Sequence, residues 1–488
     1  MDDRELHQIL KKEFGYQRFR PGQLATIKAL LSGQNALSIL PTGSGKTLIY
    51  QFVGRIKPGL VVVVSPLLSL MQDQVNRLRL AGNSGVAMVS SLLDPVSRHE
   101  LINHLDHYHY LFFSPEMITN DWVVNQLRRV NISLVVIDEA HCVSAWGPDF
   151  RPHYLLLRQV MLALHQPTTL MLTATAPPRV AADLVAKLGF ADAAVQIIRQ
   201  SVDRPNIFLA VRQVASEQEK LTKLRQLVTR YGGRGIIYFS SRKLATKTAE
   251  WLSQETGMSV APYHAGIDAV DRYRIQQQFM NDRLQVICAT SAFGMGIDKD
   301  DVRYVIHYHM PKSIEAYVQE IGRAGRNGQA ALALLLYSPG DEQLPLMLGQ
   351  VKLPSDDVMT AYQQHQLELA SLGDSAEIIA FYLDHGWQPN QVRHLFTNRW
   401  RATKQQVGQM LTYATSSGCC RQQIADHFGE QLASRPLLCC SKDQADWQKK
   451  LQLPSAGMQV DHDNKFSWQS RLRDLFNLAS KSSDHLDS

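Results

Sequence analysis

The chain has few cysteines, no long apolar segment and no strong excess of charge of one sign. Six cysteines in 488 residues are too few for a disulfide scaffold, which favours a reducing, cytoplasmic setting. No apolar run approaches the roughly 20 residues that a membrane-spanning helix needs, and residues 1–5 are too polar to open a secretory signal. The 51 Lys and Arg residues outnumber the 45 Asp and Glu residues only slightly, so a polyanionic partner is mildly favoured.

A hydrophobic content of 45% is enough for packed cores, and it excludes a mainly disordered or collagen-like chain. Short runs rich in valine and isoleucine recur, and a longer amphipathic stretch follows each one. Six of these runs are residues 60–64, 134–137, 169–172, 235–239, 286–288 and 304–306. This alternation predicts an α/β fold with parallel sheets. Since ligands bind at the carboxyl ends of such strands, the polar residues that close these runs are the candidates for a site.

The pattern occurs twice, which predicts two tandem parallel-sheet domains at residues 1–200 and 201–338. The valine- and isoleucine-rich runs then stop, and residues 339–445 read as a small, mainly helical C-terminal region. Residues 446–488 are polar, with balanced charges, and are predicted to form a tail.

A glycine-rich loop follows the apolar run at residues 37–40. It comprises Thr42, Gly43, Ser44, Gly45, Lys46 and Thr47. Glycines let backbone N–H groups converge on phosphate oxygens, the lysine adds positive charge, and the threonine hydroxyl suits Mg²⁺. The strict phosphate-loop pattern has glycine where Leu40 stands, so the alternative is an ordinary strand-to-helix turn.

Two acids, Asp138 and Glu139, close the apolar run at residues 134–137. One carboxylate at a strand end can hold Mg²⁺, and its neighbour can orient or deprotonate an attacking water molecule. The alternative is a solvated acidic pair that opens a loop. The very apolar strand before the pair argues against that alternative, and the two motifs together predict a hydrolase for nucleoside triphosphates.

Longer sequence segments around these motifs resemble the helicase motifs of the RecQ family of superfamily-2 DNA helicases. They are FGYQRFRPGQ at 14–23, DEAHCVSAWGPDFRP at 138–152, FGMGIDK at 293–299 and QEIGRAGR at 319–326. Shorter matches lie at 65–70, 114–116 and 173–175, so the resemblance runs from about residue 5 to 338. It implies two RecA-like domains and ATP-driven 3′→5′ unwinding of DNA in repair and recombination. It also implies that Tyr16, Arg20 and Gln23 recognise adenine.

The same resemblance implies roles around the triphosphate. Lys46 and Thr47 match the phosphate and Mg²⁺ positions, and Asp138 and Glu139 match the metal and catalytic-base positions. Arg323 and Arg326 match the arginines that reach ATP from the second domain, where a guanidinium can stabilise transition-state charge. We therefore expect ATP to be gripped between the two domains, and its hydrolysis to drive stepping along one DNA strand.

Trp146, Phe150 and Arg151 follow the acid pair and are candidates for a DNA-sensing loop, because aromatic rings stack on bases and arginine contacts the backbone. The alternative is that both aromatic residues belong to the core. Residues 385–425 carry five Lys or Arg residues and no acid, which suits either a DNA-contacting surface or a solvated helix face.

The chain departs from the family where a zinc subdomain is expected. Candidate zinc ligands are Cys420 or its neighbour Cys419, then Cys439, Cys440 and Asp443. Adjacent cysteines chelate awkwardly, and Leu437 occupies an outer ligand slot. The sequence therefore favours a zinc-free remnant and leaves zinc open.

We expect a monomer that binds DNA, both single-stranded and as a forked duplex, and that has no membrane segment. The location would be the cytoplasm, or the nucleoid of a bacterium. A single-stranded-DNA-binding protein as partner is left open. Two alternatives are an RNA-directed superfamily-2 ATPase, and an ATP-gated nucleic-acid clamp or remodeller that does not separate strands. The histidine at position 141 argues against the first, and the shortened C-terminus favours the second.

Overall fold

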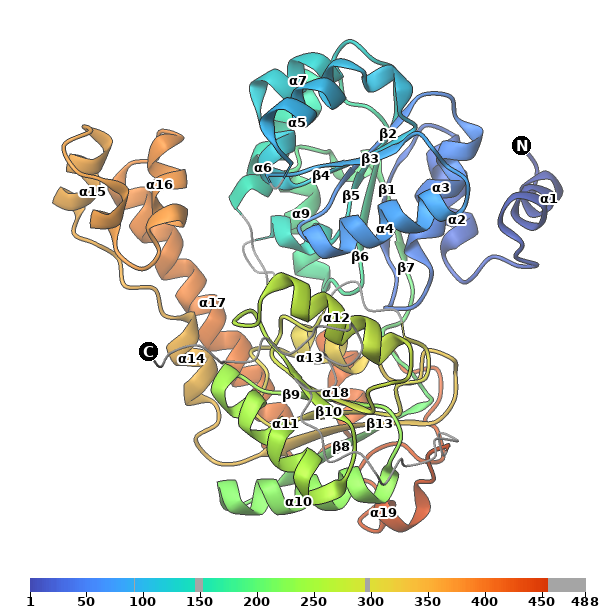
Figure 1. Ribbon diagram of the computed structural model, residues 1–488, viewed down its shortest axis with the longest axis vertical. Helices are drawn as coiled ribbons and strands as arrows, with labels where there is room; N and C mark the ends of the chain where they lie inside the picture. The colour runs from blue at the N-terminus through green and yellow to red at the C-terminus, as the bar shows by residue number, and fades with distance from the viewer. Residues whose placement is uncertain (92, 145–151, 295–298, 455–488) are drawn as a thin grey trace, which may run out of the picture.

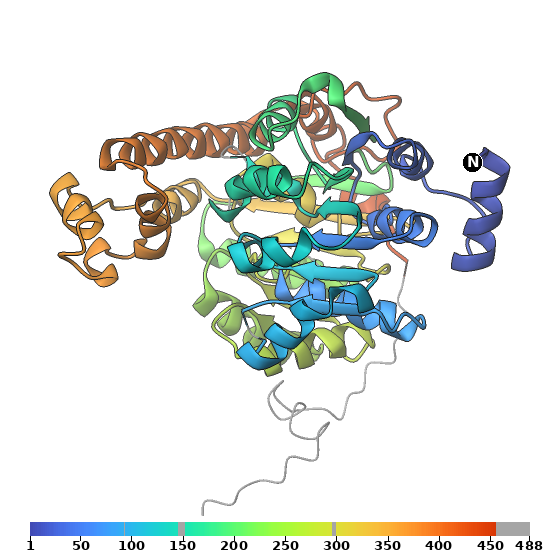
Figure 2. The ribbon, with the colours of Figure 1, turned by 90° about the horizontal axis from the view of Figure 1, so that it is seen from above.

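The computed structural model describes residues 1–91, 93–144, 152–294 and 299–454. Two α/β lobes lie one above the other, and a helical arm projects from them to one side (Figures 1 and 2). The short helix at the N-terminus, α1, lies at the opposite side of the first lobe. The α/β class and the two parallel sheets predicted from the sequence are confirmed.

The first lobe is built on a seven-stranded sheet in the order β3-β4-β2-β5-β6-β1-β7, and its described pairings are all parallel. Its strands are β1 (Asn35–Ile39), β2 (Leu60–Val64), β3 (Val86–Val89), β4 (Tyr110–Phe113), β5 (Ile132–Ile137), β6 (Thr169–Thr173) and β7 (Val195–Arg199). Every residue of β2 is buried, because helices cover both faces of the sheet.

Two helices of the first lobe, α1 and α2, precede the first strand, and the others lie between strands. These helices are α1 (Asp3–Phe14), α2 (Gln23–Leu31), α3 (Lys46–Ile56), α4 (Leu68–Leu80), α5 (Pro95–Asn103), η1 (Leu105–His107), α6 (Pro115–Ile118), α7 (Asp121–Leu127), η2 (Ala140–Val143), η3 (Pro152–Leu156), α8 (Leu157–Ala163), α9 (Pro178–Lys187) and η4 (Asp192–Ala194).

The second lobe holds a six-stranded parallel sheet in the order β10-β11-β9-β12-β13-β8. Its strands are β8 (Ile207–Gln213), β9 (Gly235–Tyr238), β10 (Val260–Tyr263), β11 (Val286–Ala289), β12 (Tyr304–His307) and β13 (Ala331–Tyr337). Its helices are α10 (Glu217–Tyr231), α11 (Arg242–Thr256), α12 (Ala269–Met280) and α13 (Ile314–Ile321). All six apolar runs singled out in the sequence lie on strands of these two sheets.

One strand leads directly from the first lobe toward the second. β7 pairs in parallel with β1, and beyond it the Gln200 N–H donates to the Ile39 carbonyl at 2.9 Å. The chain then runs through a linker, residues 201–206, into β8. The strand that ends at the glycine-rich loop therefore lies beside the strand that leaves the lobe.

The C-terminal region is helical, as the sequence indicates. It contains α14 (Gln343–Gly349), α15 (Asp356–Gln363), η5 (Leu369–Leu372), α16 (Ala376–Asp384), α17 (Pro389–Thr415), α18 (Cys420–His427) and α19 (Trp447–Lys450). α15, α16 and the N-terminal half of α17 form the projecting arm. This arm has a core of its own, which includes Tyr382 and Phe396. The arm also contacts the first lobe, since the His153 and Phe381 rings lie 4.6 Å apart.

The start of the segment predicted to be a polar tail packs on the second lobe. Trp447 is 5% exposed and stacks on Phe208 with ring centroids 5.2 Å apart, and Leu451 is buried beside it. The polar character of residues 446–488 does not extend to these two side chains. The domain boundaries drawn from the sequence remain predictions.

Candidate active site

The glycine-rich loop connects β1 to α3. Gly43 and Gly45 adopt φ angles of 83° and 75°, in the left-handed region that favours glycine. A Cβ atom on Gly45 would lie 2.8 Å from Gln23 Nε2, so a side chain there would displace the Gln23 amide. Lys46 is the first residue of α3, and its Nζ donates to the Leu40 carbonyl at 3.1 Å. The loop therefore presents open backbone at a helix N-terminus, the geometry that binds phosphate.

Two side chains that the resemblance assigns to adenine also brace this loop. Gln23 Nε2 donates to the carbonyls of Ser44 and Gly45, both at 2.9 Å, and Gln23 Oε1 accepts from the Arg20 N–H at 2.8 Å. The Arg20 guanidinium donates to the Gly43 carbonyl. Tyr16 is 55% exposed and lies outside these contacts. Gln23 and Arg20 thus orient the loop carbonyls away from the position of a phosphate.

The acid pair closes β5, two strands from β1 in the sheet. Glu139 is 8% exposed with a φ of 46°, a strained conformation for a residue with a side chain. Its Oε2 lies 3.3 Å from His141 Nδ1, which lies 3.1 Å from Thr173 Oγ1 at the end of β6. The three adjacent strands β5, β6 and β1 therefore bring their carboxyl-end residues to one edge, as predicted for a ligand site.

The environment of Asp138 suits a divalent cation. Burial, and then the neighbouring Glu139 carboxylate, raises the pKa of Asp138 above its usual range, while Lys46 opposes that rise. A cation beside this carboxyl group would favour its ionised form, and a threonine hydroxyl with a carboxylate is an oxygen donor set that Mg²⁺ accepts. Ser44 Oγ is buried without a hydrogen-bond partner among the described residues, which also fits a phosphate oxygen. The residues present therefore fit ATP with Mg²⁺.

Arg326 reaches this site from the second lobe. One cleft is lined by Lys46, Thr47, Asp138, Glu139 and Arg326. A Cβ atom placed on Gly43 would lie 3.4 Å from Arg326 Cγ, so the arginine stem passes directly along the phosphate loop. Lys46 and the two carboxylates of the first lobe thus line one cleft together with the Arg326 guanidinium of the second lobe.

Arg323 takes a different course. It is 4% exposed and is not among the residues that line the cleft. Its guanidinium lies beside Tyr238 of β9, within 3.5 Å of the position of a Cβ on Gly294. Its Nε is buried without a hydrogen-bond partner among the described residues. In this arrangement, contact with the nucleotide loop comes from Arg326, and Arg323 packs inside the second lobe.

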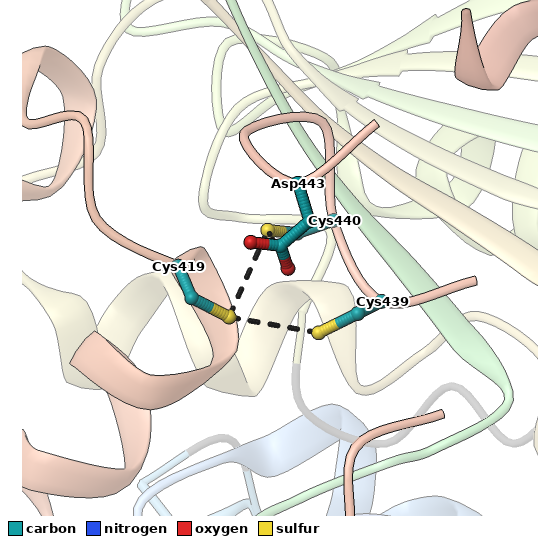
Figure 3. Close-up of side chains that lie close together, drawn as sticks. All are labelled: Cys419, Cys439, Cys440 and Asp443. Carbon is teal, nitrogen blue, oxygen red and sulfur yellow. Dashed lines mark hydrogen bonds between the residues drawn. The ribbon is translucent and has the colours of Figure 1, made fainter. Parts of the chain in front are cut away.

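Four donor side chains meet in the C-terminal region, as Figure 3 shows. The Sγ atom of Cys419 lies 3.6 Å from that of Cys439 and 3.8 Å from that of Cys440, and Cys440 Sγ lies 3.2 Å from Asp443 Oδ2. The sequence assignment of Cys420 to this group is corrected, because Cys419 supplies the fourth donor. Cys420 is the first residue of α18, and its buried thiol is hydrogen-bonded to Cys440 and to Tyr413.

Comparison with known proteins matches both lobes. A DEAD/DEAH box helicase model matches residues 20–184, and a helicase conserved C-terminal domain model matches residues 219–328. The chain is 37% identical to the probable ATP-dependent DNA helicase RecS of Bacillus subtilis, over 97% of this chain and 98% of that protein. It is 34% identical to the ATP-dependent DNA helicase RecQ of Pasteurella multocida, over 96% of this chain and 73% of that protein. The chain belongs to the RecQ family of ATP-dependent DNA helicases.

The fold of this RecQ-family chain is shared more widely. The DEAD-box helicase Mss116, in its structure bound to ssRNA and UDP-BeF, superposes with a TM-score of 0.59 at 14% identity. The match covers 83% of this chain and 90% of the Mss116 chain. At this identity the likeness concerns the two-lobe architecture alone.

Several predicted residues of the RecQ-family pattern lie outside the described part of the chain. These are Trp146, Phe150 and Arg151 of the candidate DNA-sensing loop. The described segment that follows them is η3, which contacts both α6 of the first lobe and α16 of the arm. Within the described residues, no helix is long and apolar enough to cross a membrane.

Among the lining residues that sequence reasoning missed are two polar residues of α4. Gln74 and Arg77 of α4 face the same cavity as Lys46 and Asp138. The available signal was their spacing of three residues, which places both on one face of a helix. That helix begins at residue 68, within the motif at residues 65–70. The sequence could therefore have indicated that one face of this helix lines the nucleotide site.

The brace on the phosphate loop leads to a prediction. Gln23→Ala should raise the KM for ATP about 10-fold, because two hydrogen bonds to loop carbonyls, each worth about 0.5–1.5 kcal/mol, are lost. Steady-state ATPase assays measure this change. Gln72→Ala on the exposed face of α4 is the matched control and should leave KM unchanged. An unchanged KM in Gln23→Ala would show that the loop keeps its shape without the brace.

Proposed function

We propose that this RecQ-family chain hydrolyses ATP with Mg²⁺, moves 3′→5′ along one DNA strand and unwinds duplex DNA in repair and recombination. The observation that carries this proposal is the position of Arg326, which lines the same cleft as Lys46 and Glu139 of the other lobe. We also propose that the protein acts as a monomer in the cytoplasm on single-stranded and forked DNA.

The side chains in the cleft divide the work of hydrolysis. Lys46 holds the β- and γ-phosphates, and Thr47 and Asp138 hold Mg²⁺, which neutralises charge on the phosphate oxygens when bound. Glu139, oriented by His141 at 3.3 Å, accepts the proton of the attacking water molecule. Arg326 stabilises the negative charge that develops on the transferred phosphoryl group.

Hydrolysis changes the contact between the lobes. With the γ-phosphate in place, Lys46 and Arg326 both have an anion to contact, which favours the closed cleft. Loss of that phosphate removes the shared contact and favours opening. Trp146, Phe150 and Arg151 are proposed to contact the DNA strand, since they belong to the segment that directly follows the acid pair. Repeated closing and opening would then step the strand along the lobes.

A forked-duplex assay tests the proposed activity. The full chain should separate a labelled duplex that carries a 3′ single-stranded tail when ATP and Mg²⁺ are present, and it should fail on a duplex that carries only a 5′ tail. Lys46→Ala serves as the inactive control. ATPase activity stimulated by DNA but without strand separation would favour the clamp, and stimulation by RNA alone would favour an RNA-directed enzyme.

We further propose that Cys419, Cys439, Cys440 and Asp443 bind one Zn²⁺. With a Zn–S bond of about 2.3 Å, two sulfur ligands of a tetrahedral site lie about 3.8 Å apart. The two measured Sγ–Sγ separations of 3.6 and 3.8 Å agree with that spacing. Cys439 and Cys440 are adjacent in the chain, but the thiols of both lie beside the thiol of Cys419 (Figure 3).

Metal analysis of the full chain tests the zinc site. The purified protein should contain one zinc per chain, and Cys439→Ser should lose the metal and melt at a lower temperature, since metal binding stabilises the folded state. Cys288→Ser on β11, outside this group of donors, is the matched control and should keep its zinc. A metal-free chain, or metal loss in Cys420→Ser but not in Cys419→Ser, would contradict the assignment.

A further inference from the structure

The linker between the lobes, residues 201–206, is held on both sides by hydrogen bonds. One side is the C-terminal region around α18, and the other is the turn after α13 that carries Arg323 and Arg326. The linker is therefore not a loose tether between two independent lobes. It connects the C-terminal region to the arginine that enters the nucleotide cleft.

The grip from the C-terminal region is made by a buried arginine and a glutamate. Arg421 in α18 is 2% exposed, and its guanidinium donates to the Asp203 carboxylate, to the Arg204 carbonyl at 3.1 Å and to the Ile207 carbonyl at 2.6 Å. Glu430 accepts from Ser201 Oγ at 2.7 Å. A buried guanidinium with this many partners holds the linker backbone in one conformation.

The linker in turn holds the turn after α13. Arg204 donates to the Gly325 carbonyl at 2.6 Å and to the Ala324 carbonyl at 3.3 Å. Asn206 Nδ2 donates to the same Gly325 carbonyl at 2.8 Å. Gly325 has a φ of 54°, and a Cβ atom there would lie 2.5 Å from Asn206 Nδ2. The next residue along the chain is Arg326, so its backbone position depends on these bonds.

We propose that Arg204 is a positioning residue for Arg326, and that Arg421 acts through the linker to hold Arg204 in place. This inference rests on the proposed role of Arg326 in hydrolysis. A shift of about 1 Å in a group that stabilises a transition state can cost about 10²-fold in rate. The helical C-terminal region thereby supports the catalytic machinery of the motor, although none of its described residues lines the cleft that holds Lys46 and Arg326.

Steady-state kinetics of Arg204→Ala test the inference. We expect kcat for ATP hydrolysis to fall about 10- to 100-fold while KM for ATP stays within about threefold, because the nucleotide-binding loop of the first lobe is untouched. In an Arg326→Ala background, Arg204→Ala should have little further effect, since its target is already gone. Arg225→Ala, which removes an exposed ion pair with Glu255, is the matched control and should leave kcat unchanged.

A second variant tests the role of Arg421 without leaving the partly exposed Asp203 carboxylate as an unpaired charge. Asp203→Asn combined with Arg421→Gln removes both charges together and should show the same fall in kcat with an unchanged KM. Unchanged kcat in both variants would overturn the inference, as would effects of Arg204→Ala and Arg326→Ala that multiply fully. If Arg326→Ala itself keeps full activity, the proposed function fails instead, and the two failures are told apart.

Discussion

Replacing Arg326 by alanine should lower kcat for ATP hydrolysis by about 10³-fold, the low end of what such an arginine contributes in phosphoryl transfer. The stem of Arg326 passes along Gly43, and the side chain shares a cleft with Lys46 and Glu139. Its charge would act mainly on the transition state, so KM for ATP should change little. Phosphate release, measured with and without single-stranded DNA, gives both constants.

Arg225→Ala again provides the comparison, because it removes a guanidinium from the same lobe at an exposed ion pair. DNA-stimulated ATPase at the normal level in Arg326→Ala would mean that the observed contact between the lobes is not the catalytic arrangement. A loss that appears only in KM would assign Arg326 to nucleotide binding.

Glu139→Gln should lower kcat by about 10²- to 10⁴-fold, because the amide cannot accept the proton of the attacking water molecule. The substitution preserves size, so the strained backbone at φ 46° and the packing against His141 are retained. Affinity for a non-hydrolysable ATP analogue should remain, and the melting temperature should not fall, since a buried charge is removed. Single-turnover hydrolysis and a nucleotide-binding titration separate the two effects.

Glu255→Gln is the control for this variant, because its carboxylate is half exposed on α11. If Glu139→Gln hydrolysed ATP at the normal rate, another group would have to be the base. A loss of nucleotide binding equal to the loss of rate would indicate that Glu139 holds the metal and not the water molecule.

The local parts of this structure could be predicted from the sequence for physical reasons. A run such as residues 60–64 has only apolar side chains, so it must be covered on both faces, and a parallel sheet provides that cover. Gly43 and Gly45 occupy left-handed positions that their residue type indicates. The acid pair follows a buried strand, and its place at the sheet edge follows from topology.

Contacts between distant segments could not be predicted in the same way. Cys419 and Cys420 are equivalent candidates in the sequence, but Cys419 precedes α18 with a ψ of 123° while Cys420 begins the helix, and only packing decides which one faces Cys439. Arg204 and Arg421 lie more than two hundred residues apart, and neither stands in a pattern that signals a partner. The separation of Arg326 from Arg323 likewise depends on how the turn at Gly325 is held.

The pairing of β7 with β1 has a mechanical consequence. The last carbonyl of β1, that of Ile39, accepts a hydrogen bond from the Gln200 N–H. The phosphate loop starts three residues after Ile39, and the linker starts at the residue after Gln200. A displacement of the loop when phosphate leaves would reach the linker through the single hydrogen bond between Gln200 and Ile39. The orientation of the second lobe would then follow the position of the phosphate loop through the linker. No signal would need to cross the core of either lobe.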